Sequence, residues 1–339
     1  MHRRSLWKQI PWLWVSVLTL ILFACAAFLS TLAAATIQRL PFSSHLLPGE
    51  QIWRQGVPAF LFGTNDTYEW SPYNIETQPA IQDALRTAGF PLVRSFFRDG
   101  GDDASLEQRI RTIENIGAHC LGVITSIFDV PYAEHLVRYL GKRCLMYEFG
   151  NEPDYEGIAA DVYLRQWNRV IPLLRGINPH AMFIGPTLSD ANLSYLQTFL
   201  TGTERSKVLP DAISFHWYPC YRQSEAACLQ KVSTVAQETQ EVRALVESIL
   251  GRDLPVGITE WNFDPSNPPP DYGDTSEFIS RFTFQALRFM MQVGVSFACQ
   301  FDAASFAGYG HLDMFDQQGR PKMQYYAIKS VIEQYRPYV

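Results

Sequence analysis

The stretch CLMYEFGNEPD, residues 144–154, carries Glu148 and Glu152 in and just after an apolar run. Burying a charge is costly unless it is paired, so acids in such a run need a specific reason. Side chains alternate along a β-strand, which places both glutamates on one face of a strand expected over 144–152. Because Pro153 cannot continue a strand ladder, we expect Glu152 to lie where the strand leaves the sheet.

Outward from this stretch, short apolar runs alternate with longer amphipathic ones, a pattern typical of α/β proteins with a parallel sheet. We expect strands over 59–65, 92–99, 120–126, 144–152, 182–188, 212–219, 256–263 and 296–306. Helical periodicity is clearest over 80–90 and 162–177. This pattern predicts a single (β/α)8 TIM barrel. A doubly wound open sheet is the alternative, but no glycine-rich phosphate loop follows the first strand.

The N-terminal residues predict a membrane segment. Basic residues precede an uncharged stretch from Ile10 to Ile37, which is long enough to cross a bilayer at ~1.5 Å per residue. The positive charges on its N-terminal side place the remainder of the chain outside the cytosol. We therefore expect an anchor or signal over 1–37, a tether over 38–57 and the catalytic barrel over 58–339.

A cleaved signal is the alternative to an anchor. Ala33 to Ala35 offers an A-x-A-like cleavage site, but the apolar run exceeds the usual ~7–15 residues. Leu22 to Cys25 is a poor match to a lipoprotein box because of Phe23. We favour an uncleaved anchor, and expect secretion if the segment is removed.

Composition narrows the classes of partner. The chain is 47% hydrophobic, 14% aromatic and 18% charged, which is typical of a globular protein with extra aromatic residues. Its net charge is -6 and no Lys/Arg run follows the N-terminus, so nucleic acid is not an expected partner. The aromatic residues fit either stacking on sugar rings or a large core. We expect a monomer.

The cysteines agree with an oxidising compartment. Cys220 and Cys228 bracket a polar loop and could close a short disulfide. Cys120 and Cys144 begin two successive expected strands, where they are either paired or simply buried, and Cys299 is expected in the core. No C-x-x-C pair or His/Cys cluster has zinc-site spacing, so we predict neither a metal nor a cofactor.

A second carboxylate follows another apolar run. Glu260 lies near the end of VGITEWNF, residues 256–263. Functional residues of TIM barrels come from the C-terminal ends of several strands, so Glu152 and Glu260 are expected at one mouth. Two such carboxylates are the minimum for glycoside hydrolysis. Either alone would more often cap a helix or pair with an arginine. Glu148 is interpreted as a buried support, with Arg94 as its basic partner.

The segments FGNEPD (149–154) and ITEWN (258–262) resemble the two signatures of glycoside hydrolase clan A. The nearest resemblance is to the β-xylosidase and α-iduronidase branch and to related exopolysaccharide glycosidases. It covers Pro58 to Pro337. The Asn-Glu-Pro triplet gains specificity from the second strand-terminal glutamate and from a His-x-Tyr on the strand between. The resemblance implies a retaining O-glycosyl hydrolase acting on β-linked bonds of a cell-surface or exported oligo- or polysaccharide.

The resemblance also implies roles for single residues. Glu152 would be the acid/base and Glu260 the nucleophile, while Asn151 would hydrogen-bond the sugar 2-hydroxyl. Arg94 matches the arginine that this clan places on its second strand to hold the nucleophile ionised, and it could also pair with Glu148.

The sixth expected strand supplies two more candidates. Tyr218 is placed to hydrogen-bond Glu260, and His216 to border the site. Either residue alone on a barrel strand is as readily a satisfied core residue.

The eighth strand departs from the clan, which often ends it with a tryptophan that floors the sugar site. Phe301 and Asp302 stand there instead, so Trp261 is the candidate for stacking on the sugar. Other candidate aromatic residues of the cleft are Trp70, Tyr73 and Tyr155.

Three alternatives stay open beside the hydrolase: a sugar-binding barrel without turnover, a transglycosylase, and a structural envelope protein. For the hydrolase, we expect the Glu152 and Glu260 carboxyl groups to lie about 5–5.5 Å apart. Because the acid/base donates a proton first, we expect a raised pKa at Glu152.

Overall fold

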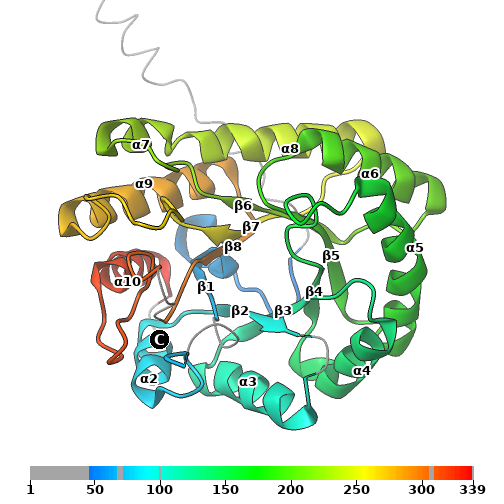
Figure 1. The fold of residues 1–339 in the computed structure, drawn as a ribbon, viewed down its shortest axis with the longest axis horizontal. Helices are drawn as coiled ribbons and strands as arrows, with labels where there is room; N and C mark the ends of the chain where they lie inside the picture. The colour runs from blue at the N-terminus through cyan, green and yellow to red at the C-terminus, as the bar shows by residue number, and fades with distance from the viewer. Residues whose placement is uncertain (1–45, 67–71, 99–100, 305–308, 338–339) are drawn as a thin grey trace, which may run out of the picture. The chain divides into compact units, whose positions relative to one another are not determined.

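The computed structural model describes residues 46–66, 72–98, 101–304 and 309–337, which belong to one compact unit. Within the described ranges, parallel strands close into a barrel in chain order, as Figure 1 shows. The strands are β1 (Gly63–Asn65), β2 (Leu92–Phe97), β3 (His119–Ile124), β4 (Met146–Phe149), β5 (Met182–Leu188), β6 (Ala212–Trp217), β7 (Val256–Trp261) and β8 (Phe297–Gln300). The predicted TIM barrel is confirmed.

Helices surround the barrel (Figure 1). They are α2 (Pro79–Ala88), α3 (Asp103–Ile116), α4 (Val130–Leu140), α5 (Ala160–Ile177), α6 (Leu193–Ser206), α7 (Glu225–Lys231), α8 (Thr234–Leu250), α9 (Ser276–Val293) and α10 (Met323–Tyr335). Apolar residues four apart, such as Phe278, Phe282 and Ala286 of α9, are buried on the side of the helix that packs into the core. Gly89 and Gly294 end α2 and α9 with φ of 83° and 73°, a conformation that favours glycine.

Seven of the eight predicted strands are shorter than expected, most of all those over 59–65, 144–152 and 296–306. The last of these is reduced to β8, which ends at Gln300. The run expected over 59–65 begins with a 3-10 helix, η2 (Ala59–Phe62), which is buried and packs against β8 before β1 starts. A short apolar run cannot distinguish a buried strand from a buried helical turn. Likewise β4 ends at Phe149, because Gly150 turns the chain with φ of 87°. Glu152 therefore lies in the loop after β4 and not on the strand.

The segment expected to be a tether packs against the barrel where it is described. Leu47 and Trp53 are buried, and the Trp53 ring stacks on Phe62 with ring centroids 5.3 Å apart. Ile52 forms an antiparallel bridge with Pro58. Residues 46–57 are therefore part of the folded unit.

Both candidate cysteine pairs form disulfides. Cys120 is bonded to Cys144, which links the first residues of adjacent strand regions, and Cys220 is bonded to Cys228. Cys299 is buried and unpaired among the described residues, as expected for a core position. The second disulfide lies beside the site described below.

The anchor predicted over 10–37 lies outside the described residues. Among the helices that are described, none has the length and apolar character needed to cross a membrane.

Candidate active site

Arg94 organises the C-terminal mouth of the barrel from β2. Its side chain is fully buried, and its guanidinium lies 2.6 Å from Glu148 (Nε to Oε2) and 2.7 Å from Glu260 (Nη1 to Oε1). Nη1 also donates to Asn65 at 2.8 Å, and Nη2 donates to Asn151 Oδ1 at 2.7 Å. Burial would lower the pKa of Arg94, but the charges of Glu148 and Glu260 raise it. One cation thus holds both glutamates, as the sequence suggested.

Glu148 is a support at the base of this network. It is fully buried on β4, and Oε1 accepts a hydrogen bond from Ser214 Oγ at 2.6 Å. Burial would raise the pKa of Glu148, but the charge of Arg94 and the Ser214 hydrogen bond lower it. Glu148 therefore stays ionised as a structural counter-ion, away from the solvent.

Glu260 lies near the end of β7, with 8% of its surface exposed. Oε1 is bound by Arg94, while Oε2 accepts a hydrogen bond from the Tyr218 hydroxyl at 3.2 Å. His216 on β6 is its neighbour across the sheet, and its Nδ1 lies 3.6 Å from Oε2. The predicted contacts of Arg94 and Tyr218 with this carboxylate are present.

Glu152 projects from the loop after β4. Its φ is 43°, a left-handed conformation that is rare for a residue with a side chain and costs ~1–3 kcal/mol. The backbone N–H of Glu152 donates to the Thr187 carbonyl of β5 at 2.8 Å, which holds this conformation. Backbone strain of this kind is concentrated at functional sites, where it aims a side chain.

His216 contacts Glu152 directly, whereas the sequence placed it only at the border of the site. Its Nδ1 lies 2.6 Å from Glu152 Oε1, and its Nε2 lies 3.4 Å from Arg94 Nη2. Because Arg94 can only donate, the neutral ring carries its proton on Nδ1, facing Glu152. Burial would lower the pKa of His216, but the charge of Glu260 and the hydrogen bond and charge of Glu152 raise it.

This contact overturns the expected raised pKa of Glu152. Burial does act to raise the pKa, but the hydrogen bond from His216 and the charges of His216 and Arg94 lower it below its usual value. In the substrate-free protein, Glu152 is therefore held as a carboxylate by His216.

The two candidate catalytic carboxylates are close together. One oxygen of Glu152, one oxygen of Glu260 and a ring nitrogen of His216 all lie within 4.8 Å of one another. A group of this kind could in principle bind a cation. Here, however, each carboxylate already has a hydrogen-bond donor. His216 Nδ1 donates to Glu152, and the guanidinium of Arg94 donates to Glu260. We therefore assign no metal to this group.

Both glutamates open onto a cavity of about 890 Å³. Its aromatic lining residues are Tyr155, Trp217, Tyr218, Tyr221, Phe301 and Tyr309. Tyr155 and Tyr221 are the most exposed of these, at 80% and 51%. Flat rings around a polar centre form a surface on which sugar rings can stack. The sequence identified Tyr155 but missed Tyr221, which its position in a loop after a barrel strand could have indicated.

Three other aromatic candidates have different outcomes. Trp261 is 1% exposed and does not line the cavity, so it cannot stack on a sugar in this conformation. Adjacent residues of a strand face opposite sides, and Glu260 takes the inward face. Tyr73 is not among the described residues that line the cavity, and Trp70 lies outside the described ranges. Phe301, which follows β8, does line the cavity.

Asn151 lies beside the catalytic candidates but is already engaged. Its Oδ1 accepts from Arg94, so any hydrogen bond to a sugar hydroxyl would be donated by Nδ2. The predicted contact with a 2-hydroxyl stays a prediction.

The fold and site define a TIM barrel with paired glutamates at its C-terminal mouth. No family model matches the sequence, and no curated protein does. Among solved structures, the chain is similar to a glucosidase from Croceicoccus marinus, with 18% identity, TM-score 0.63, and coverage of 81% of this chain and 67% of that one.

It is also similar to an α-L-arabinofuranosidase from Thermotoga maritima, with 15% identity, TM-score 0.62, and coverage of 84% of this chain and 71% of that one. A GH128 endo-β-1,3-glucanase from Amycolatopsis mediterranei has 17% identity, TM-score 0.51, and coverage of 74% and 94%. At these identities the likeness establishes the fold. These neighbours are glycoside hydrolases; the resemblance of this chain to clan A, and to a particular branch of it, stays a prediction.

Proposed function

We propose that the protein is a retaining β-glycosidase with Glu260 as nucleophile and Glu152 as acid/base. The observation that carries the proposal is the pair of carboxylates with oxygens within 4.8 Å, facing one cavity. Retaining enzymes place the two carboxyl groups about 5–5.5 Å apart, whereas inverting enzymes need about 6.5–9.5 Å to admit a water molecule. The shorter spacing favours direct attack by one carboxylate.

In the first step, Glu260 attacks the anomeric carbon and forms an ester bond to it. The bond from that carbon to the leaving oxygen breaks, and the leaving oxygen takes a proton from Glu152. Arg94 and Tyr218 hold Glu260 through different oxygens, which fixes the carboxylate for attack. Positioning of this kind lowers the barrier because the reacting groups need not be ordered during the reaction.

In the second step, Glu152 removes a proton from water, which attacks the anomeric carbon from the face that the leaving group vacated. The ester bond breaks and Glu260 leaves as a carboxylate. Two inversions give a product with the configuration of the substrate. Arg94 stabilises the departing carboxylate in the same geometry that held it before the reaction.

The proposal is tested by screening aryl β-glycosides and β-linked polysaccharides with the wild-type protein beside Glu260→Ala. We expect the wild type alone to release sugar. Release by neither protein, or by both at similar rates, would contradict the proposal.

The contact of His216 with Glu152 should affect how the activity depends on pH. Glu152 must be protonated to act as the acid, and His216 lowers its pKa, so activity should fall as pH rises through that lowered value. In His216→Phe the hydrogen bond and charge are lost while burial remains, so the pKa of Glu152 should rise. The alkaline limb of kcat/KM should therefore move to higher pH.

The control for this experiment is His135→Phe, which removes an exposed histidine on α4 that pairs with Asp103 at 2.7 Å. The pH dependence of kcat/KM in His135→Phe should be the same as in the wild type. An alkaline limb that does not move in His216→Phe, or that moves to lower pH, would show that His216 does not set the protonation of Glu152.

We further propose that the barrel acts on a cell-surface or exported polysaccharide and is held at the membrane by residues 10–37. The two disulfides support a location outside the cytosol, since disulfides persist in oxidising compartments. Full-length protein should fractionate with membranes, and deletion of residues 1–40 should release an active soluble barrel. Wholly soluble protein that begins just after Ala35 would instead identify a cleaved signal.

A further inference from the structure

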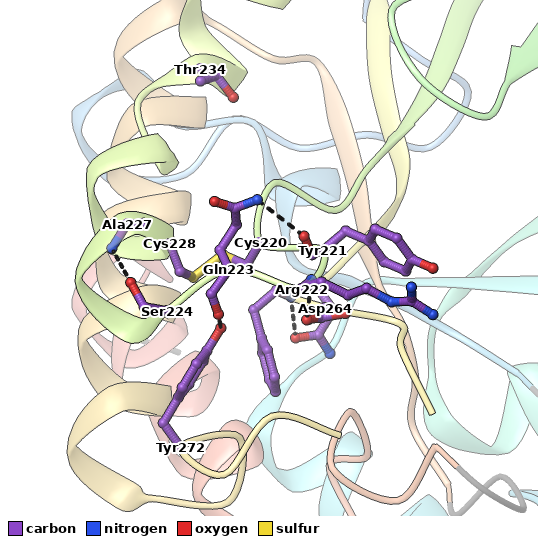
Figure 2. The surroundings of a disulfide bond; sticks show 12 residues. Cys220, Tyr221, Arg222, Gln223, Ser224, Ala227, Cys228, Thr234, Asp264 and Tyr272 are labelled. Carbon is purple, nitrogen blue, oxygen red and sulfur yellow. Dashed lines mark hydrogen bonds between the residues drawn. A yellow bond between two sulfur atoms is a disulfide. The ribbon is translucent and has the colours of Figure 1, made fainter. Parts of the chain in front are cut away.

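The loop after β6 is a rigid part of the cavity wall. The disulfide from Cys220 to Cys228 ties the loop to α7 (Figure 2). Within the loop, the Gln223 N–H donates to the Cys220 carbonyl at 2.9 Å, and Cys220 N–H donates to Phe263 at 2.9 Å. The Tyr272 hydroxyl donates to the Gln223 carbonyl at 2.9 Å. Bonds to α7, to the end of the β7 region and to the following loop thus fix its position.

This rigid loop presents Tyr221 and Arg222 at the cavity. Arg222 has φ of 53°, and its backbone N–H donates to Asp264 Oδ2 at 2.9 Å, which holds the left-handed conformation. The guanidinium lies over the Tyr221 ring, 5.1 Å from its centroid. Figure 2 shows the two side chains next to each other, both projecting away from the disulfide. Both residues line the same cavity as Glu152 and Glu260.

The charge of Arg222 has no ion-pair partner in the described part of the chain, where no carboxylate oxygen is found within 4.0 Å of it. Asp264 contacts the backbone N–H of Arg222 and not its guanidinium, and its other oxygen accepts from the Ser266 N–H. Stacking on Tyr221 occupies a face of the guanidinium and leaves its N–H edge available. That edge matches a carboxylate with two parallel hydrogen bonds.

Most of the other ionisable residues that line the cavity are acidic. Asp190 and Glu238 line it together with the two catalytic candidates, whereas Arg222 is the only arginine or lysine among its described lining residues. An acidic group on a bound saccharide would be repelled by most of the cavity and attracted at this wall. The charge distribution therefore favours binding of an acidic group of the saccharide beside Arg222.

We propose that Tyr221 and Arg222 form a subsite for an acidic sugar, in which the sugar ring stacks on the part of the Tyr221 ring that the guanidinium leaves open and a uronate carboxylate binds the edge of Arg222. The inference rests on the proposed glycosidase function and gives the substrate class as a uronate-containing β-linked saccharide. The disulfide keeps the subsite in place without a contribution from the substrate, which lowers the ordering cost of binding.

The test compares saccharides that differ only in oxidation at C6. Binding to full-length Glu260→Gln, which should prevent turnover, is measured by calorimetry for three pairs of hexasaccharides: β-1,4-glucose with β-1,4-glucuronate, β-1,4-mannose with β-1,4-mannuronate, and β-1,3-glucose with β-1,3-glucuronate. We expect the acidic member of at least one pair to bind about 5–10-fold more tightly at low salt. The preference should shrink as ionic strength rises.

Arg222→Gln in the same background should remove this preference, and Arg222→Lys should retain part of it, because lysine keeps the charge but lacks the planar fork. The matched control is Arg165→Gln, an exposed arginine on α5 that pairs with Asp161 outside the cavity. It should preserve the preference in full.

A preference that survives Arg222→Gln, or the absence of any preference for an acidic member, including failure of both members to bind, would overturn the inference. Its failure is distinguishable from failure of the glycosidase proposal. Turnover of aryl β-glycosides by the wild type without an acidic preference would reject only the subsite. An Arg222-dependent preference without any turnover would reject only the glycosidase activity.

Discussion

Replacing Glu260 with alanine is expected to abolish hydrolysis of every aryl β-glycoside that the wild-type protein cleaves. Without the carboxylate no glycosyl ester can form, so we expect kcat/KM to fall at least about 10⁴-fold, which corresponds to ~5.4 kcal/mol of transition-state stabilisation. The loss should be measured with an activated substrate such as a dinitrophenyl glycoside, for which departure of the leaving group needs little acid assistance.

The fold should survive this substitution. Arg94 also pairs with Glu148, at 2.6 Å, and this ion pair should still compensate its buried charge when Glu260 is removed. The contrasting variant is Glu148→Gln, in which a fully buried carboxylate is lost. Breaking a buried ion pair costs about 3–5 kcal/mol, so this variant should lower the free energy of unfolding in a denaturant titration. Glu260→Ala should change it much less.

Added azide identifies which carboxylate is the nucleophile. In Glu260→Ala, azide should attack from the vacated face and give an α-glycosyl azide from an activated β-glycoside. Residual activity within about tenfold of the wild type, or a β-glycosyl azide from this variant, would show that Glu260 is not the nucleophile.

The sequence predicted most of the barrel because parallel strands buried on both faces are continuous apolar runs. β5 spans Met182–Leu188, as predicted. The start of the barrel was harder to predict, since the buried helical turn at Ala59–Phe62 has the same apolar composition as a strand. An apolar run in the sequence predicts burial well. When the run is short, it does not distinguish a strand from a helical turn.

The part of the site whose residues lie on barrel strands could be predicted from the order of the strands. Arg94, Glu148 and Glu260 lie on β2, β4 and β7 and meet because inward side chains of a closed barrel share one interior, where a buried arginine must be paired. The burial of Trp261 also follows from strand alternation once Glu260 is placed inward. That signal was present in the sequence and pointed against stacking on a sugar.

The protonation of Glu152 could not be predicted in the same way. It depends on a 2.6 Å contact with His216, which lies 64 residues further along the chain. The contact requires the left-handed backbone of Glu152 as well as the facing ring of His216 on β6. Sequence pattern places both residues at the mouth, but it does not give the side-chain orientation that reverses the direction of a pKa shift.

Replacing Glu152 with alanine should separate the two chemical steps. Loss of the acid should slow cleavage of substrates with poor leaving groups about 10²–10⁴-fold, while dinitrophenyl glycosides should still form the glycosyl-enzyme. That intermediate should then accumulate, because no base activates water. A burst of dinitrophenol equal to the enzyme concentration, followed by slow turnover, is the expected measurement.

The same variant tests the stereochemistry. In the proposed mechanism Glu152 faces the side of the anomeric carbon from which the leaving group departs, so its removal should open that face to a small anion. Azide should attack the glycosyl-enzyme there, restore turnover and give a β-glycosyl azide, and proton NMR of the wild-type reaction should show the β-anomer as the first-formed product. One oxygen of Glu152 and one of Glu260 lie within 4.8 Å of each other, a short spacing that favours double displacement over inversion. An initial α-anomer from the wild type, or no azide rescue in Glu152→Ala, would therefore reject Glu152 as the acid/base of a double displacement.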